Sequence, residues 1–224
     1  MIRLYNDDCL NIIGKMPDES IDLVVTDCPY HIVSGGCTND AVKIGRSTER
    51  DSHGNIYVNG TQHKNLGSIF NEFNSNCYTK QGKLFKHNDI EFKDWLPGIY
   101  RVLKEGSHCY VMINARNLKD LQQAAENEGF IFQQLLVWDK GNATPNKYYM
   151  NALEFILMLR KGRAKNINNM GTKNILQVPN ITRTKAHPTE KPPELMRILI
   201  ENSTNAGDTV LDPFMGVGGD GNSK

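Results

Sequence analysis

Long apolar runs are missing from this sequence, and no hydrophobic stretch approaches the ~20 residues that a membrane-spanning helix needs. The opening residues, MIRLYNDDCL, also lack the apolar core of a signal peptide. Cysteine is scarce: its five residues stand at irregular spacings without a CxxC pair, which favours free thiols in a reducing compartment. These absences predict a cytoplasmic protein that does not engage a membrane.

Two kinds of ligand site are also poorly supported. Cys28, His31 and Cys37 lie close together, but no fourth residue at metal-ligand spacing accompanies them, so we expect no bound metal. Gly216 begins a GxxxxG spacing, yet Asn222 stands where a phosphate-binding loop needs lysine. A nucleotide phosphate site of that type is therefore excluded.

Charge is balanced overall, with a formal net charge of +1, but it is distributed unevenly. Residues 139–191 carry ten lysines and arginines against three acids, so this stretch is +7 and the remainder is −6. A polyanion would be attracted to such a stretch. A solvated surface loop explains the same charges equally well, and charge alone leaves both interpretations open.

Apolar segments of strand length alternate with amphipathic ones, and the run 21–26 (IDLVVT) has the β-branched content of a buried parallel strand. Strands are expected at 2–5, 21–26, 108–113, 130–137, 155–160 and 209–211, and helices at 9–16, 92–103, 118–128 and 192–202, with a kink or break at Pro97-Gly98. This order predicts an α/β fold, a single domain over 1–224 with a mostly parallel, doubly wound sheet. Residues 31–89 are a polar insert without periodicity, either disordered or a functional loop over a site.

Ligands of doubly wound sheets bind beyond the carboxyl ends of the strands, where this sequence places the tetrapeptide DCPY at 27–30. An exocyclic amine on a nucleobase is a poor nucleophile, and two acceptors aimed at its N–H bonds favour attack. The Asp27 carboxylate and the Cys28 carbonyl, held by Pro29, could supply them, and Tyr30 could stack on the base. A plain strand-to-loop turn with a helix-capping aspartate remains the alternative.

Two further segments can be interpreted either as functional motifs or as ordinary turns. Residues 212–219 (DPFMGVGG) follow a strand, and their glycines allow close approach of the backbone to a ligand. Residues 187–192 (HPTEKP) precede a helix and, taken alone, read more simply as a helix-entry turn.

Together and in this order, DCPY, HPTEKP and DPFMGVGG resemble the beta class of DNA amino-methyltransferases, whose pattern is DPPY, HPTEKP and DPFxGSGTT. The resemblance spans nearly the whole chain outside the insert. It implies a circularly permuted, Rossmann-like sheet that uses S-adenosylmethionine, a recognition segment at 161–186, and double-stranded DNA as partner. With aspartate at the first motif position, the chain resembles the adenine-N6 enzymes more than the cytosine-N4 enzymes. The resemblance thus implies a site-specific adenine-N6 methyltransferase of the kind found in restriction–modification systems. A cytosine-N4 enzyme and a homodimeric state stay open. HPTEKP and the order of the motifs argue against the remaining alternative, a methylase of RNA or of protein amides.

The resemblance also assigns roles to individual residues. Catalytic roles fall to Asp27, Cys28, Pro29 and Tyr30; cofactor binding falls to Asp8, His187, Thr189, Lys191, Asp212, Phe214, Gly216 and Gly218; contacts with DNA, mostly with phosphates, fall to Lys161, Arg163, Lys165, Lys173, Arg183 and Lys185.

Two departures from the family pattern matter. Cys28 replaces the first proline of DPPY, but a cysteine carbonyl is equally able to accept a hydrogen bond. The last residues, 219–224, contain no apolar side chain, so the family's next strand and its ribose-binding acid are expected to be missing. Part of the cofactor half would then be absent, and an impaired or inactive remnant that binds DNA or a partner is the alternative function.

Overall fold

The computed structural model describes residues 2–29, 48–50, 56–58, 61–63, 90–144, 148–163, 165–181 and 190–215. The chain divides into two units: Met1–Tyr30 with Ile90–Lys224, and His31–Asp89. The second unit has the bounds of the predicted insert. Its described residues form an antiparallel sheet of three strands, β2 (Thr48–Arg50), β3 (Ile56–Val58) and β4 (Thr61–His63).

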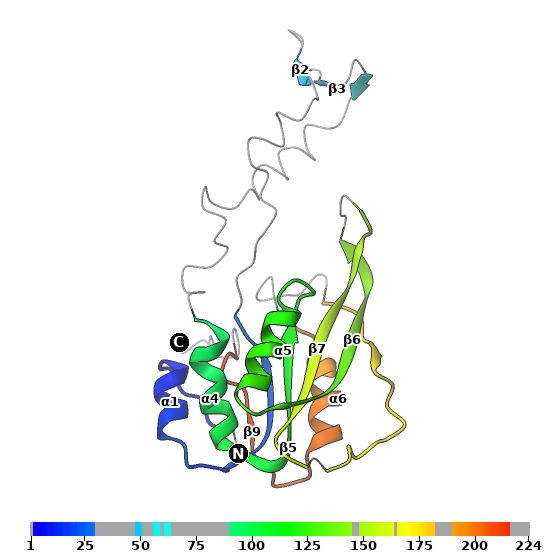
Figure 1. Ribbon diagram of the computed structural model, residues 1–224. Helices are drawn as coiled ribbons and strands as arrows, with labels where there is room; N and C mark the ends of the chain where they lie inside the picture. The colour runs from blue at the N-terminus through cyan, green and yellow to red at the C-terminus, as the bar shows by residue number, and fades with distance from the viewer. Residues whose placement is uncertain are drawn as a thin grey trace, which may run out of the picture. The chain divides into compact units, whose positions relative to one another are not determined.

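The first unit is built on a six-stranded sheet with the order β8-β6-β7-β5-β1-β9 (Figure 1). Its strands are β1 (Ile21–Asp27), β5 (Leu103–Ile113), β6 (Ile131–Thr144), β7 (Asn151–Arg160), β8 (Ile175–Gln177) and β9 (Val210–Leu211). β5 and β9 pair in parallel with β1, and β8 with β6, whereas β7 is antiparallel to both β5 and β6. The predicted α/β sheet is confirmed, with β7 as its antiparallel strand.

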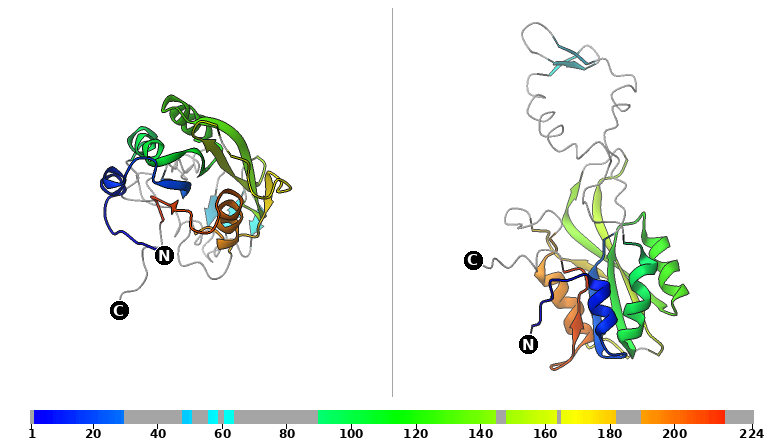
Figure 2. Two further views of the ribbon diagram at one scale, coloured as in Figure 1. Left: turned by 90° about the horizontal axis from the view of Figure 1, so that it is seen from below. Right: turned by 90° about the vertical axis from the view of Figure 1, so that its left-hand side faces the viewer.

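Helices cover both faces of this sheet, and the two cores follow from the alternation of side chains along β1 (Figure 2). Val24 packs in the core that includes helices α1 (Cys9–Lys15), α4 (Phe92–Val102) and α5 (Leu118–Asn127). Leu23 and Val25 pack in the core that includes helix α6 (Pro193–Ser203). Because β1 is buried on both faces, its apolar run is nearly continuous.

Two local expectations were wrong. Residues 2–5 form no strand, and α4 runs through Pro97 without a break. Pro97 is exposed, whereas Trp95, Leu96, Ile99 and Val102 on the same helix are buried, so tertiary packing holds the helix together despite the lost hydrogen bond.

Gly98 has a packing role next to that proline. A Cβ at this position would lie 2.7 Å from Cγ2 of Ile13, so the glycine lets α1 approach α4 closely. None of the described helices is long and apolar enough to cross a membrane.

Candidate active site

The candidate site lies where β1 and β9 end side by side. The two strands are parallel, with Leu23 opposite Val210 and Val24 opposite Leu211, so the residues that follow them emerge at one edge of the sheet. Thr26 Oγ1 donates a hydrogen bond of 2.7 Å to Asp212 Oδ1, which joins positions 186 residues apart in sequence. The structure thus brings Asp27 and the turn that begins at Asp212 to the same place.

Asp212 organises the turn after β9. Its Oδ1 atom also accepts from the backbone N–H of Phe214 at 3.0 Å. Burial raises the pKa of the Asp212 carboxyl and the charge of Asp27 adds to that shift, while the hydrogen bonds from Thr26 and Phe214 oppose it. The carboxylate therefore serves the local fold before any ligand is present.

The ring of Phe214 leans on a buried tryptophan. The Trp95 and Phe214 rings meet edge to face, with centroids 5.4 Å apart and planes at 82°. Trp95 is fully buried, and its Nε1 is one of two buried side-chain polar atoms, among the described residues, that have no hydrogen-bond partner. A buried donor of this kind carries a desolvation cost that a ligand could offset.

Asp27 is held by a lysine that we had expected at the cofactor. Lys191 Nζ donates to Asp27 Oδ2 at 2.6 Å and lies 3.6 Å from Glu154 Oε2. Glu154 in turn accepts from Lys140 Nζ at 3.3 Å. Positive and negative charges thus alternate from Lys140 on β6, through Glu154 on β7 and Lys191 before α6, to Asp27 at the end of β1.

The pKa values in this cluster reflect burial and neighbouring charge. Burial raises the pKa of the Asp27 carboxyl, and the Lys191 ammonium offsets only part of that rise. For Lys191, burial acts to lower the pKa, but Asp27 and Glu154 outweigh it and raise the pKa above the ordinary value. Lys191 is therefore a cation at neutral pH, matched to the carboxylate that it holds.

The remaining catalytic positions differ in what the structure describes. Cys28 is buried with Sγ 3.8 Å from the carbonyl oxygen of Met112, and burial raises the pKa of its thiol far above the ordinary value. A thiol of this kind is not a nucleophile, so any role of Cys28 belongs to its backbone. Pro29 is half-buried, and Tyr30 lies outside the described residues.

Among the expected cofactor residues, Asp8 has a clear local role: it caps α1 by accepting from the backbone N–H of Leu10 at 2.8 Å. His187, Thr189, Gly216 and Gly218 lie outside the described residues. No group of three metal-ligating side chains occurs in the described ranges.

The basic segment divides, and its first part lies at the other edge of the sheet. Lys161 directly follows Arg160, the last residue of β7, and its ammonium lies at Leu103, the first residue of β5, and at Glu19, which precedes β1. The Lys161 side chain is buried: Nζ donates to the carbonyl oxygen of Leu103 at 2.8 Å and pairs with Glu19 at 3.2 Å. Its cation serves the fold at the edge away from Asp27, which argues against a contact with phosphate.

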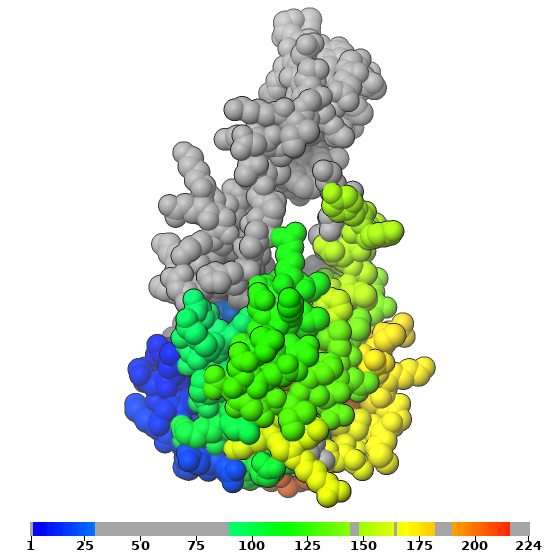
Figure 3. All heavy atoms as spheres, viewed as in Figure 1, coloured from blue at the N-terminus to red at the C-terminus, as the bar shows by residue number. Residues whose placement is uncertain are grey.

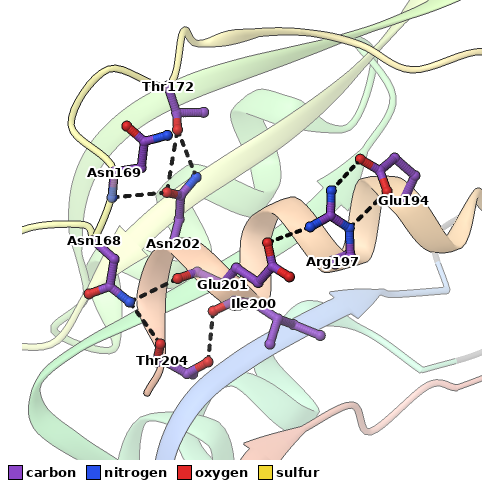
Figure 4. A network of polar contacts seen from close by, with 9 residues as sticks. All are labelled: Asn168, Asn169, Thr172, Glu194, Arg197, Ile200, Glu201, Asn202 and Thr204. Atoms are coloured by element: carbon purple, nitrogen blue, oxygen red, sulfur yellow. Dashed lines mark hydrogen bonds and ion pairs between the residues drawn. The ribbon is translucent and has the colours of Figure 1, made fainter. Parts of the chain in front are cut away.

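The next residues of the segment pack on the carboxyl-terminal end of α6 (Figure 4). Asn168 Nδ2 donates to the carbonyl oxygens of Glu201 and Thr204 at 2.8 and 2.7 Å. Asn202 Oδ1 accepts from the backbone of Asn169 and from the Thr172 hydroxyl, both at 3.3 Å. This part of the expected recognition segment is therefore tied down by hydrogen bonds.

Of the other basic residues expected at DNA, three are exposed and two are not described. Arg163 and Lys165 follow Lys161 at the same edge, where the backbone N–H of Lys165 donates to Gly106. Lys173 precedes β8, the strand farthest from β1 and β9 in the sheet. Arg183 and Lys185 lie outside the described residues.

Replacing Lys161 by alanine is expected to lower the free energy of unfolding by about 1–3 kcal/mol, because buried acceptors lose a charged donor. The salt dependence of DNA binding should not change. Urea denaturation and a binding titration over salt would check this, with the exposed Lys165→Ala as the matched loss of one cation. A flatter salt slope for Lys161→Ala alone would restore the phosphate role.

Sequence reasoning missed Glu154, Lys140 and Trp95. Glu154 carried a usable signal, because it is the one acid in the run NALEFILMLR. A charge within a buried strand usually has a partner. Trp95 offered none, since its position on an amphipathic helix is that of an ordinary core residue.

Sequence comparison relates this chain to known DNA methylases. Residues 21–219 match the family N6_N4_Mtase, described as DNA methylase. The type II methyltransferases M2.DpnII of Streptococcus pneumoniae and M2.MboI of Moraxella bovis are 27% and 25% identical, each over 96% of this chain and 77% and 76% of their own length.

Solved structures support the fold. M1.HpyAVI, crystallised as a SAM complex, aligns with a TM-score of 0.61 at 21% identity over 99% of this chain and 86% of its own. The PvuII DNA methyltransferase, named as cytosine-N4-specific, aligns with a TM-score of 0.59 at 15% identity over 93% of this chain and 72% of its own. With the family match covering most of its length, this chain belongs to the N6_N4_Mtase family of DNA methylases.

Proposed function

We propose that this methylase transfers a methyl group from S-adenosylmethionine to the N6 amine of adenine in double-stranded DNA, in the cytoplasm. One observation carries the proposal: the Asp27 carboxylate and the turn organised by Asp212 share one edge of the sheet, linked through Thr26 at 2.7 Å. An acceptor for an amine thus stands beside a turn suited to a nucleoside-type cofactor.

Asp27 acts on the amine as a hydrogen-bond acceptor. Accepting an N–H bond localises the nitrogen lone pair, and the Cys28 carbonyl could accept the second N–H. Lys191 fixes the carboxylate through Oδ2, which leaves Oδ1 for the amine. The rate gain would come from positioning and from electrostatic stabilisation of the positive charge that develops on nitrogen.

The residues after β9 fit the cofactor. Asp212 has an oxygen beyond the one bonded to Thr26 and Phe214, Phe214 offers an aromatic face, and the unpartnered indole N–H of Trp95 is a buried donor. When bound, S-adenosylmethionine would supply an electrophilic methyl group. Asp212 and Phe214 would hold and orient it, with Asp8, His187, Thr189, Gly216 and Gly218 as the further candidates.

Adenine is favoured over cytosine by Asp27 at the first motif position. The deciding experiment is transfer of labelled methyl to duplex DNA, followed by digestion to nucleosides. We expect N6-methyladenine; N4-methylcytosine would overturn the base assignment. Absence of transfer together with absence of cofactor binding by calorimetry would instead favour a remnant that binds DNA without catalysis.

Double-stranded DNA must reach the edge that carries Asp27, where the β6–β7 hairpin extends beyond the sheet (Figure 1). In the strand register Asp27 is opposite Met112, and Met112 is opposite Ile156. Residues 151–155 of β7 therefore extend past Asp27 by roughly 16 Å of strand. Near the hairpin end Tyr149 is 91% exposed and Met150 is 59% exposed. Figure 3 shows the hairpin standing out from the surface of the first unit.

Exposed aromatic and apolar side chains on a hairpin that rises from the edge of the sheet carrying Asp27 suit stacking on DNA bases left unpaired by base extrusion. Tyr149→Ala is therefore expected to weaken duplex binding roughly tenfold, within the ~1–3 kcal/mol range of one base–aromatic stack. Fluorescence anisotropy at fixed salt measures this. Tyr149→Phe, which keeps the ring, should bind like the parent; equal affinity of the alanine variant would remove the hairpin from the DNA surface.

A further inference from the structure

Glu154 occupies an unusual position for an acid. It lies on β7 between two mostly buried ammonium groups, with Lys140 Nζ at 3.3 Å and Lys191 Nζ at 3.6 Å, and the side chain of each lysine is only about a tenth exposed. We propose that Glu154 is a positioning residue for methyl transfer, which shares the Lys191 ammonium with Asp27 and so controls how Asp27 meets the target amine. This rests on the proposed function.

The sheet explains why this influence passes through a lysine. β1 and β7 are separated by β5, so their backbones are about 9–10 Å apart. At that separation the two short acidic side chains do not meet, and the longer Lys191, arriving from the chain before α6, contacts both. Lys140 fixes Glu154 from the neighbouring strand β6, where Trp138 is opposite Glu154.

Lys191 interacts more closely with Asp27 than with Glu154, but it contacts both carboxylates. Lys191 Nζ is 2.6 Å from Asp27 and 3.6 Å from Glu154, so the two carboxylates compete for one cation at unequal distances. If Glu154 lost its charge, that competition would end and Lys191 would hold Asp27 more tightly. A carboxylate neutralised in this way is a weaker acceptor for the amine N–H.

The charged groups around Asp27 make the effect directional. Lys191 lowers the pKa of Asp27, Glu154 raises it, and Asp27 and Asp212 repel each other. The Cys28 thiol beside it is neutral, and Lys140 acts on Asp27 through Glu154. Glu154→Gln should therefore lower the pKa of Asp27, and Lys191→Met should raise it.

The opposite shifts of the Asp27 pKa in the two variants predict opposite changes in the pH dependence of the reaction. Asp27 has to be ionised to accept the amine, so transfer is lost as the pH falls through the pKa of Asp27. The acidic limb of the kcat/KM profile should move to lower pH in Glu154→Gln and to higher pH in Lys191→Met. At the plateau, Glu154→Gln should reduce kcat about tenfold with KM unchanged, less than the loss of a group that touches the reacting atoms.

The test combines this kinetic profile with ¹³C NMR titration of the Asp27 carboxyl in the protein without cofactor or DNA. Glu201→Gln is the matched control, because it removes one exposed carboxylate that pairs with Arg197 on α6; it should shift neither measurement. Glutamine preserves the shape of Glu154 and keeps one oxygen that can accept from Lys140, while it loses the acceptor that faces Lys191. Thermal melting verifies that the fold is kept.

The outcomes separate the two proposals. An Asp27 titration that is the same in Glu154→Gln and the parent, or a change in KM alone, would overturn the positioning role. If the parent transfers no methyl group, the proposed function fails. The NMR titration still decides in that case whether Glu154 and Asp27 share Lys191.

Discussion

Asp27→Ala is expected to slow methyl transfer by roughly 10²–10⁴-fold while cofactor binding is retained. The substitution removes the carboxylate that accepts the amine N–H, and Lys191 then has nothing to orient at that point. Single-turnover transfer of labelled methyl to duplex DNA, with cofactor and DNA saturating, measures the chemical step directly.

Asp27→Asn is the informative control for this prediction. Its amide oxygen can still accept an N–H bond, but it carries no charge, so its rate should fall between those of the parent and the alanine variant. Full activity in Asp27→Ala would show that the amine is activated elsewhere, and the assignment of the 27–30 turn would fail.

The second large effect is expected at Asp212. Asp212→Ala removes the acceptor of both the Thr26 hydroxyl and the Phe214 N–H, and with it the carboxylate proposed to hold the cofactor. Affinity for S-adenosylmethionine should fall about 100-fold, close to the ~1.5–3 kcal/mol of a hydrogen bond to a charged group. Isothermal titration calorimetry gives the affinity.

Asp212→Asn separates the turn from the charge. The asparagine oxygen can replace Oδ1 as acceptor of both local hydrogen bonds, so the turn and the Trp95–Phe214 contact should persist. Affinity should then drop less than in the alanine variant. Unchanged affinity in Asp212→Ala would place the cofactor away from this turn, and the proximity of Asp27 to the turn at Asp212 would no longer explain catalysis.

Local sequence patterns predicted the two strands that lead into the site and the acidic residue that follows each of them. The apolar run before Asp27 identified β1, because a strand buried on both faces leaves a nearly continuous apolar signature. The short apolar segment before Asp212 identified β9, although its two residues are not fully buried. Residues that follow two neighbouring parallel strands lie at the same edge of the sheet. The two motifs therefore come together once β1 and β9 are neighbours, whatever the details of side-chain packing.

Three features escaped because they depend on register or packing. β6 was expected to end near residue 137 but continues to Thr144, since pairing with β7 supports polar residues that show no apolar pattern. The basic segment was treated as one surface, yet Lys161 is drawn into the fold by Leu103 and Glu19. Pro97 was expected to break a helix that burial of its neighbours preserves.

By itself, then, the sequence determined the α/β class, the buried strands and the acids that follow them, because side-chain hydrophobicity and chain direction are local properties. Only the tertiary structure decided that Lys191 serves Asp27 and that Glu154 and Lys140 complete the cluster. Electrostatic partnership depends on distance in space, and four charges from β1, β6, β7 and the entry to α6 become neighbours only when the sheet has formed.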